Sequence, residues 1–294
     1  MESTLGRKRM SAVWLWAAAV VAIPGWLLAQ TAPTESDIYC AGFFTQRQIE
    51  SGLTVQGSED AGFKNEFATG DYVYLSKGRD AIASPGGQYL VLRAVTDVNR
   101  KEAFKGQHEL LAGLGTLYAQ VARIEVQVLH ERTSTAKILA SCQPVLAGDI
   151  AIPWNARSAP AYKTPRMTDR FAPSSGKATG LIASAKEFDQ WLGEGKIVYL
   201  NLGSSHGLQT GSYLRVVRPY MTGAHAAFGN AARNYPTELT GASVGRRLTP
   251  EEVASLPREV LGEVMVLSAE EGSSTGIITY TRAEVSVGDG VEVE

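Results

Sequence analysis

The sequence lacks an excess of charge of either sign. The 294 residues carry 28 basic and 30 acidic side chains, a formal net charge of −2. A nucleic-acid-binding surface requires an excess of basic residues, and bulk disorder requires high net charge with few apolar residues. Because 44% of the residues are hydrophobic, the composition excludes bulk disorder. Because the net charge is slightly negative, it gives no basic surface for nucleic acid. It fits a globular chain, and 30 glycines indicate many turns.

Motifs for metal and phosphate binding are also lacking. The four histidines, His108, His130, His206 and His225, show no metal-ligand spacing. Residues 174–177 (Ser-Ser-Gly-Lys) match only the end of a phosphate loop and follow a proline-rich stretch, where that loop needs a strand. We therefore expect no metal and no cofactor.

A long hydrophobic run occurs only at the N-terminus. Arg7, Lys8 and Arg9 precede an apolar stretch from Ser11 to Ala29, the pattern of a secretory signal. An uncleaved anchor is the alternative, and it would associate the N-terminal segment with a membrane. Either interpretation predicts an exported protein, periplasmic or otherwise in the cell envelope.

Cysteine is scarce, with Cys40 and Cys142 the only two. In an oxidising compartment they are expected to form one disulfide, closing a loop of about 100 residues. That bond would pin residues 37–44 to a strand near Ser141. Two reduced buried thiols, or a single nucleophile, are the alternatives, but no Cys-x-x-Cys and no neighbouring histidine supports them.

The chain instead contains an internal repeat. Four blocks recur in the same order, with apolar strand patterns followed by glycine turns. The matched blocks are 70–78 with 195–203, Gly87–Leu90 with Gly211–Leu214, 134–138 with 274–278, and Gly148-Asp149 with Gly288-Asp289. We interpret as structural turns the residues Gly78, Gly87, Gly148, Asp149, Gly203, Gly207, Gly211, Gly288 and Asp289.

The repeat predicts a mainly β protein with two homologous small antiparallel β-barrel or sandwich modules. Each would have about five or six strands. The predicted layout is a signal peptide or anchor at 1–29, a disulfide-pinned segment at 30–59, a first β-module at 60–153, a proline-rich linker at 154–176 and a second β-module at 177–294.

Short helices are expected outside the strands. Leu110, Leu111, Leu114 and Leu117 recur at helical spacing in an excursion from Asn99 to Tyr118. A second excursion, from Pro219 to Glu259, contains a capping box at residues 249–252. A third helix is predicted between Ser184 and Gly193, where Ser184 and Glu187 form another capping pattern.

The second half resembles the C-terminal domain of flagellar assembly protein T. The residues that carry the resemblance are 198–203, the turn from His206-Gly207 to Gly211, the hydroxyl run 273–275 and Gly288-Asp289. In the first copy Asp80-Ala81 stands where His206-Gly207 stands. The Tyr-Cys-x-Gly-Phe-Phe pattern at 39–44 also resembles a group of exported bacterial proteins. The resemblance implies a non-enzymatic envelope protein.

Two patterns bear on catalysis. Residues 272–276 fit Gly-x-Ser-x-Gly, but a nucleophile elbow requires a helix after the serine, and a β-rich run follows here. We predict a hairpin turn at that position. The acidic pair Glu251-Glu252 is expected at a helix N-terminus and Glu270-Glu271 in a hairpin loop, although their separation in a fold would decide any glycosidase role.

The sequence therefore predicts a non-enzymatic exported envelope protein that acts as a scaffold or partner-binding module. It would display its two excursions from rigid modules to an envelope protein or cell-wall polymer, and the oligomeric state is left open. A carbohydrate-binding protein is the first alternative and a hydrolase the second. The candidate contact residues are Tyr220, Met221, His225, Phe228, Arg233 and Tyr235.

Overall fold

The computed structural model describes residues 32–59, 62–82, 84–96, 102–164, 169–218, 249, 251 and 257–294. The signal or anchor predicted for residues 1–29 lies outside these ranges. Within them, no helix is both long and apolar enough to cross a membrane. The described chain is mainly β, as the sequence predicted, and its few helices are short.

The first module is an antiparallel sheet. Its strand order is β2-β3-β6-β5-β4-β7, and alternate side chains such as Val73 and Leu75 point into the core. The two ends of the sheet meet, since the Gly148 amide donates to the Val55 carbonyl and the Val55 amide donates to the Asp149 carbonyl. The strands are β2 (Val55–Ser58), β3 (Tyr72–Leu75), β4 (Gln88–Val95), β5 (Thr116–Leu129), β6 (Ser134–Ser141) and β7 (Ile150–Pro153).

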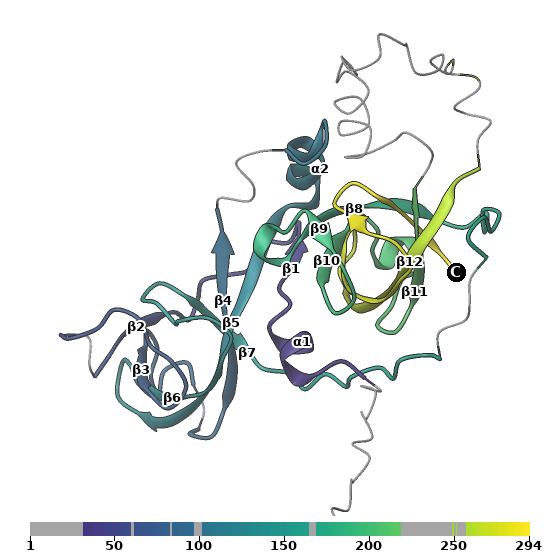
Figure 1. Cartoon of the computed structure of the whole chain (residues 1–294). Coiled ribbons are helices and arrows are strands. Elements are labelled where there is room, and N and C mark those ends of the chain that lie inside the picture. Colours follow the sequence, from purple (N-terminus) through teal and green to yellow (C-terminus); the bar gives the residue numbers. More distant parts are fainter. Residues whose placement is uncertain are drawn as a thin grey trace, which may run out of the picture. The chain divides into compact units, whose positions relative to one another are not determined.

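The second module is a closed antiparallel barrel with the order β10-β13-β12-β11-β15-β8. Figure 1 shows its strands curving into a closed ring. The side chains in its interior are apolar and include Leu200, Leu214 and Ile278. A short two-stranded sheet pairs β9 (Trp191–Leu192) with β14 (Val285–Ser286). Along the chain, β9 lies between β8 and β10, and β14 lies between β13 and β15. The barrel strands are β8 (Thr179–Ala185), β10 (Ile197–Leu200), β11 (Tyr213–Arg218), β12 (Glu259–Ala269), β13 (Ser274–Thr281) and β15 (Gly290–Val293).

The two modules match strand by strand. The β5–β6 hairpin has its register shifts at Arg123/Ile124 and at Val126/Val128. The β12–β13 hairpin has them at the positions 140 residues later, Glu263/Val264 and Val266/Ser268. Since a bulge shifts every later pair in a strand, matching bulges indicate the same backbone path in both halves.

An arginine–aspartate pair also recurs. In the first module Arg93 donates from Nε and Nη2 to Asp149 at 2.7 Å each. In the second, Arg218 makes the same two bonds to Asp289 at 2.6 and 2.5 Å. Both carboxylates lie directly after a glycine with positive φ, +95° at Gly148 and +97° at Gly288. Each carboxylate therefore joins a tight turn to a neighbouring strand.

Steric contact explains another repeated glycine. A Cβ at Gly78 would lie 2.4 Å from the His130 carbonyl oxygen, and a Cβ at Gly203 would lie 2.2 Å from that of Glu270. In each module this glycine packs against the turn of the long hairpin, so only glycine fits there. The turn glycines Gly207 and Gly211 also have positive φ values, +80° and +88°.

The alignment of Gly87 with Gly211 is wrong by one residue. Gly86, not Gly87, has the positive φ of +87°, and its amide donates to the Val126 carbonyl as that of Gly211 donates to Val266. The strand registers give an offset of 125 residues throughout this block. Sequence identity at a tyrosine had favoured the offset of 124, whereas hydrogen bonding decides the register.

The expected helices are found in part. Helix α2 (Gln107–Leu114) lies in the first excursion, although Leu117 belongs to β5. The helix predicted from Ser184 is wrong, because β8 continues to Ala185 and only a 3₁₀ turn, η1 (Lys186–Phe188), follows. Pairing of β8 with both β10 and β15 outweighs the local capping pattern. Most of the helix predicted from Thr249 lies outside the described residues.

Candidate functional site

The N-terminal segment is fixed to the first module at two points. Helix α1 (Glu35–Tyr39) is followed by the disulfide between Cys40 and Cys142, which comes directly after β6. Strand β1 (Phe43–Thr45) then pairs antiparallel with the start of β5. The predicted disulfide and the predicted pinning of residues 37–44 near Ser141 are both found.

Three side chains of the second module hold the same segment from the other side. The Tyr199 hydroxyl donates to the Ala41 carbonyl at 2.7 Å, and the Thr275 hydroxyl donates to the Gly42 carbonyl at 2.9 Å. Ser273 Oγ donates to the carbonyl of residue 44 at 2.7 Å. We call Tyr199, Ser273 and Thr275 the hydroxyl cradle. It binds residues 41–44 through their backbone carbonyls, on the outer face of the barrel; β1 begins at Phe43, and Gly42 before it has a positive φ of +74°.

An aromatic side chain anchors the segment beside the cradle. Phe44 is 2% exposed and meets the Tyr199 ring edge-on, with the ring centroids 5.3 Å apart. Ala183 of β8 and leucines of α2 complete its apolar surroundings. Burial raises the pKa of the Tyr199 hydroxyl, which therefore stays protonated and able to donate.

Helix α2 also contacts the second module. The fully buried Gln107 donates from Nε2 to the Ala183 carbonyl at 2.8 Å, and Phe104 packs against Gly288. The described part of the first excursion therefore packs against the second module through one face of α2, and its display to a partner stays a prediction. Sequence reasoning missed the role of Gln107. A glutamine is usually exposed, so nothing in the sequence indicated that this one is buried against the second module.

The serine-rich run 272–276 was predicted to be a turn, and only its start is one: Gly272 and Ser273 lie in the turn after β12, whereas residues 274–276 begin β13. The hydroxyl of Ser273 is used to hold the N-terminal segment, and Ser274 is buried on the inward side of β13. A strand follows the serines, so the strand–turn–helix geometry of a nucleophile elbow is not present at this position.

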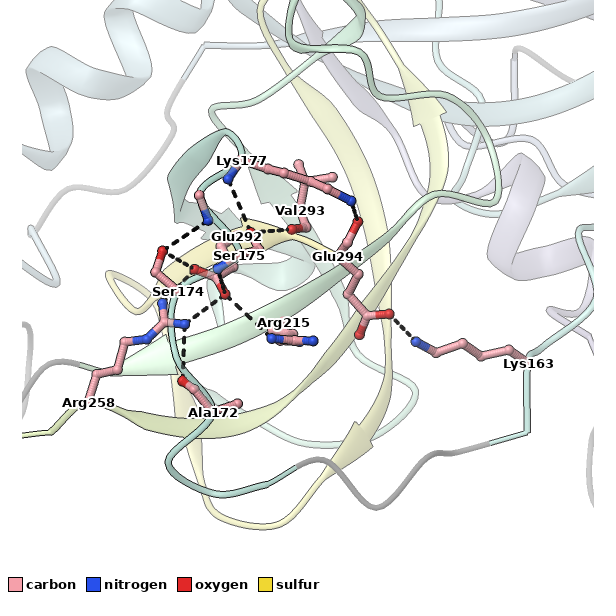
Figure 2. A network of polar contacts seen from close by, with 11 residues as sticks. Lys163, Ala172, Ser174, Ser175, Lys177, Arg215, Arg258, Glu292, Val293 and Glu294 are labelled. Atoms are coloured by element: carbon pink, nitrogen blue, oxygen red, sulfur yellow. Dashed lines mark hydrogen bonds and ion pairs between the residues drawn. The ribbon is translucent and has the colours of Figure 1, made fainter.

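The segment predicted as a proline-rich linker packs against the second module. Glu292 of β15 is fully buried and receives two bonds from Arg258, at 2.5 and 2.7 Å. Ser174 and Ser175 donate to the same carboxylate at 3.2 Å each, so residues 174–175 are tied to the barrel (Figure 2). The hydrogen bond from Arg258 holds the pKa of Glu292 below its ordinary range.

A second buried carboxylate, that of Glu263 on β12, meets the same segment at Lys163. Lys163 pairs with Glu263 at 3.0 Å and also with Glu294, and its ammonium lies 4.3 Å from the centroid of the Tyr213 ring. Burial raises the pKa of Glu263, and Lys163 opposes that shift. Residues 163–164 and 169–175 therefore lie on the barrel, and we call them the strap. They are held by ion pairs whose charges a spacer in solvent would leave hydrated.

The first module carries an open pocket at its β2–β3 edge. Its volume is about 540 Å³ and its walls contain an aromatic ring and several polar groups. Tyr74 is 37% exposed there. The lining residues are Gln56, Gly57, Ser58, Tyr74, His130 and Thr133, and we call this site the Tyr74 pocket.

The remaining candidates have separate outcomes. The contact residues between Tyr220 and Tyr235 lie outside the described ranges, so they stay predictions. Glu270 and Glu271 lie in the β12–β13 turn, as expected. Among the side chains that the structure describes, no group of three or more His, Cys, Asp or Glu is arranged to hold a metal ion.

Comparison of the chain with protein-family models gives no match. Comparison with curated proteins gives none either.

The cradle predicts that removing the Tyr199 hydroxyl destabilises the fold more than removing the equivalent hydroxyl of Tyr74. Tyr199→Phe leaves the Ala41 carbonyl without its donor, so we expect a loss of about 1–3 kcal/mol in the free energy of unfolding. The matched variant Tyr74→Phe, at the equivalent position of the first module, should change it by less than about 0.5 kcal/mol. Urea denaturation measures both, and equal small effects would show that the cradle bond does not hold the segment.

The strap predicts a specific loss of stability in acid. The pKa of Glu292 is lower in the folded state, so its contribution is complete above the unfolded value of about 4.3 and is lost as the pH falls through the folded value. Urea denaturation from about pH 6 down to about pH 3 should show a steeper decline for the native protein than for Glu292→Gln. Glu263 is present in both proteins, so its opposite shift cancels in the comparison. Parallel curves would contradict the assignment.

Proposed function

We propose that this protein is a non-enzymatic, exported protein of the bacterial cell envelope that acts as a scaffold or partner-binding module. The hydroxyl cradle carries this proposal, because it is a surface that holds a peptide segment through its backbone carbonyls. It uses three side-chain donors to three backbone carbonyls, together with a seat for one aromatic ring. Recognition through backbone groups and one anchored side chain is how many partner-binding modules take up peptides.

Rigidity supports the scaffold part of the proposal. The disulfide, the β1–β5 pairing, the cradle and the strap all restrain segments outside the two sheets. A binding surface on a restrained framework loses little conformational entropy when a partner docks.

Two observations support export. The Cys40–Cys142 disulfide fits an oxidising compartment, where such bonds persist. The basic and apolar pattern of residues 7–29 fits a secretory signal. The resemblance of the second half to the C-terminal domain of flagellar assembly protein T agrees with an envelope location.

Export is tested with a fusion. Residues 1–59 joined to an alkaline phosphatase that lacks its own signal should give an enzyme active in the periplasm. The same fusion without residues 7–29 should be inactive, since that phosphatase needs its disulfides. The intact protein, recovered without reductant, should contain no free thiol by mass spectrometry. An inactive first fusion, or two free thiols, would contradict export.

The predicted contact surface is tested by deletion. A chain without residues 221–247 should lose the envelope component that crosslinks to the full chain in cells. Its unfolding midpoint and its disulfide should stay the same, which separates lost contact from lost folding. If the crosslinked component and every envelope phenotype are unchanged, residues 221–247 are not the contact surface.

A carbohydrate-binding role is the second candidate. The Tyr74 pocket favours it, because an exposed aromatic ring beside amide, hydroxyl and imidazole groups suits the apolar face and hydroxyls of a sugar. Retention on insoluble cell wall that is lost in Tyr74→Ala would support this role.

A further inference from the structure

The Tyr74 pocket is the first module's counterpart of the hydroxyl cradle. Tyr74 pairs with Thr135 across β3 and β6, as Tyr199 pairs with Thr275 across β10 and β13. The same offset makes Thr133 the counterpart of Ser273. All three hydroxyl positions of the cradle therefore recur in the first module, in the same register.

The neighbours of these positions correspond as well. Gly57 of β2 pairs with Tyr74, as Ser184 of β8 pairs with Tyr199, and in both strands a bulge immediately precedes the paired residue. This places Gln56 where Ala183 lies in the second module. Ala183 packs beside Phe44 and α2, whereas Gln56 lines an open pocket.

Occupancy separates the two sites. Tyr199 is 3% exposed under the N-terminal segment, and Tyr74 is 37% exposed. The part of the second module that Phe44 covers thus corresponds to a cavity of about 540 Å³ in the first. The fold contains one filled and one open copy of the same site.

We propose that the open copy binds an extended peptide segment of a partner protein, with an aromatic side chain of that segment seated against Tyr74. The proposal deepens the proposed function and rests on its partner-binding role. Backbone carbonyls of the segment accept hydrogen bonds from the hydroxyls of Tyr74, Thr133 and Thr135. Thr135 Oγ1 lies 2.9 Å from His130 Nε2. In the tautomer with its hydrogen on Nε2 the ring donates to this hydroxyl, which then keeps its own proton for the segment.

The outer face next to the pocket indicates what else the segment carries. Around the cradle, Met265, Leu267 and Ile277 are buried together with Ala41. The equivalent residues of the first module are Glu125, Gln127 and Lys137. A segment lying there meets charged and amide groups, so its residues beside the aromatic anchor are polar rather than apolar.

A second copy of this chain does not suit the pocket through its own N-terminal strand. Phe44 and Ala41 of each copy are already buried, and Cys40 is bound to Cys142. The N-terminal strand of a second copy is therefore not the occupant, and the proposal commits to a segment of a different protein. Three outward-facing hydroxyl donors along one strand pair can bind the backbone carbonyls of a peptide segment. A folded surface, in which such carbonyls are already paired, does not offer them.

The test uses a peptide based on the strand in the filled copy, with polar residues beside the aromatic anchor. The probe is the fluorescently labelled peptide Tyr-Ser-Ser-Gly-Ser-Phe-Thr-Gln-Arg, the sequence of residues 39–47 with serine in place of Cys40, Ala41 and Phe43. Fluorescence anisotropy with the disulfide-bonded full chain should show saturable binding. Tyr74→Ala and Thr133→Val should each weaken it, by about tenfold and about threefold respectively.

Matched controls identify the site. Tyr280→Ala, a tyrosine on β13 outside both sites, should leave the affinity unchanged. A probe with alanine at the position of Phe44 should bind about tenfold more weakly than the original. Far-ultraviolet circular dichroism and urea denaturation should show that all variants are folded.

Three results would overturn the inference. They are no saturable binding at millimolar probe, binding that Tyr74→Ala does not weaken, and Tyr74-dependent binding of N-acetylglucosamine oligomers without binding of the peptide. The last would assign the pocket to a glycan. These failures differ from failure of the proposed function itself, which the export fusion and the deletion of residues 221–247 test independently.

Discussion

The contact on which the rest of the structure depends is the set of hydrogen bonds between the hydroxyl cradle and the carbonyls of residues 41, 42 and 44. This strand is joined to the first module by the disulfide and by pairing with β5, and to the second module by the cradle. Because its carbonyls are buried, each must find a donor, and an unsatisfied one would cost about 1–3 kcal/mol. The strand therefore belongs to both modules at once.

Duplication supplied two copies of one strand-binding surface, and the two copies differ in what covers them. The backbone path, the bulges and the arginine–aspartate pairs are the same in both. The outer face is apolar in the second module, where the strand and the strap cover it, and polar in the first. Burial of apolar area favours permanent coverage in one copy, whereas a hydrated polar face permits reversible binding in the other.

Much of this arrangement follows from local sequence patterns. Period-two alternation and glycine turns predicted the strands, the repeat predicted two modules, and the scarcity of cysteine predicted one disulfide. Leucines at helical spacing predicted α2. These features depend on residues close together in the chain, or on matching two copies, so no knowledge of packing was required. The turn between β12 and β13 was also recognised, because strand propensity follows directly after the serines.

Other features were decided only by contacts between distant residues. Ser184 has a capping pattern, yet barrel closure needs β8 as a sixth strand, and pairing on both sides outweighs a local helix signal. Prolines at 154–176 indicated a spacer, yet Glu292 and Glu263 bind this segment from across the barrel. The sequence by itself determined the β class, the repeat and the disulfide, since these are set by periodicity and composition. Tertiary structure decided which strand fills which surface, because that depends on groups that meet only after the barrels close.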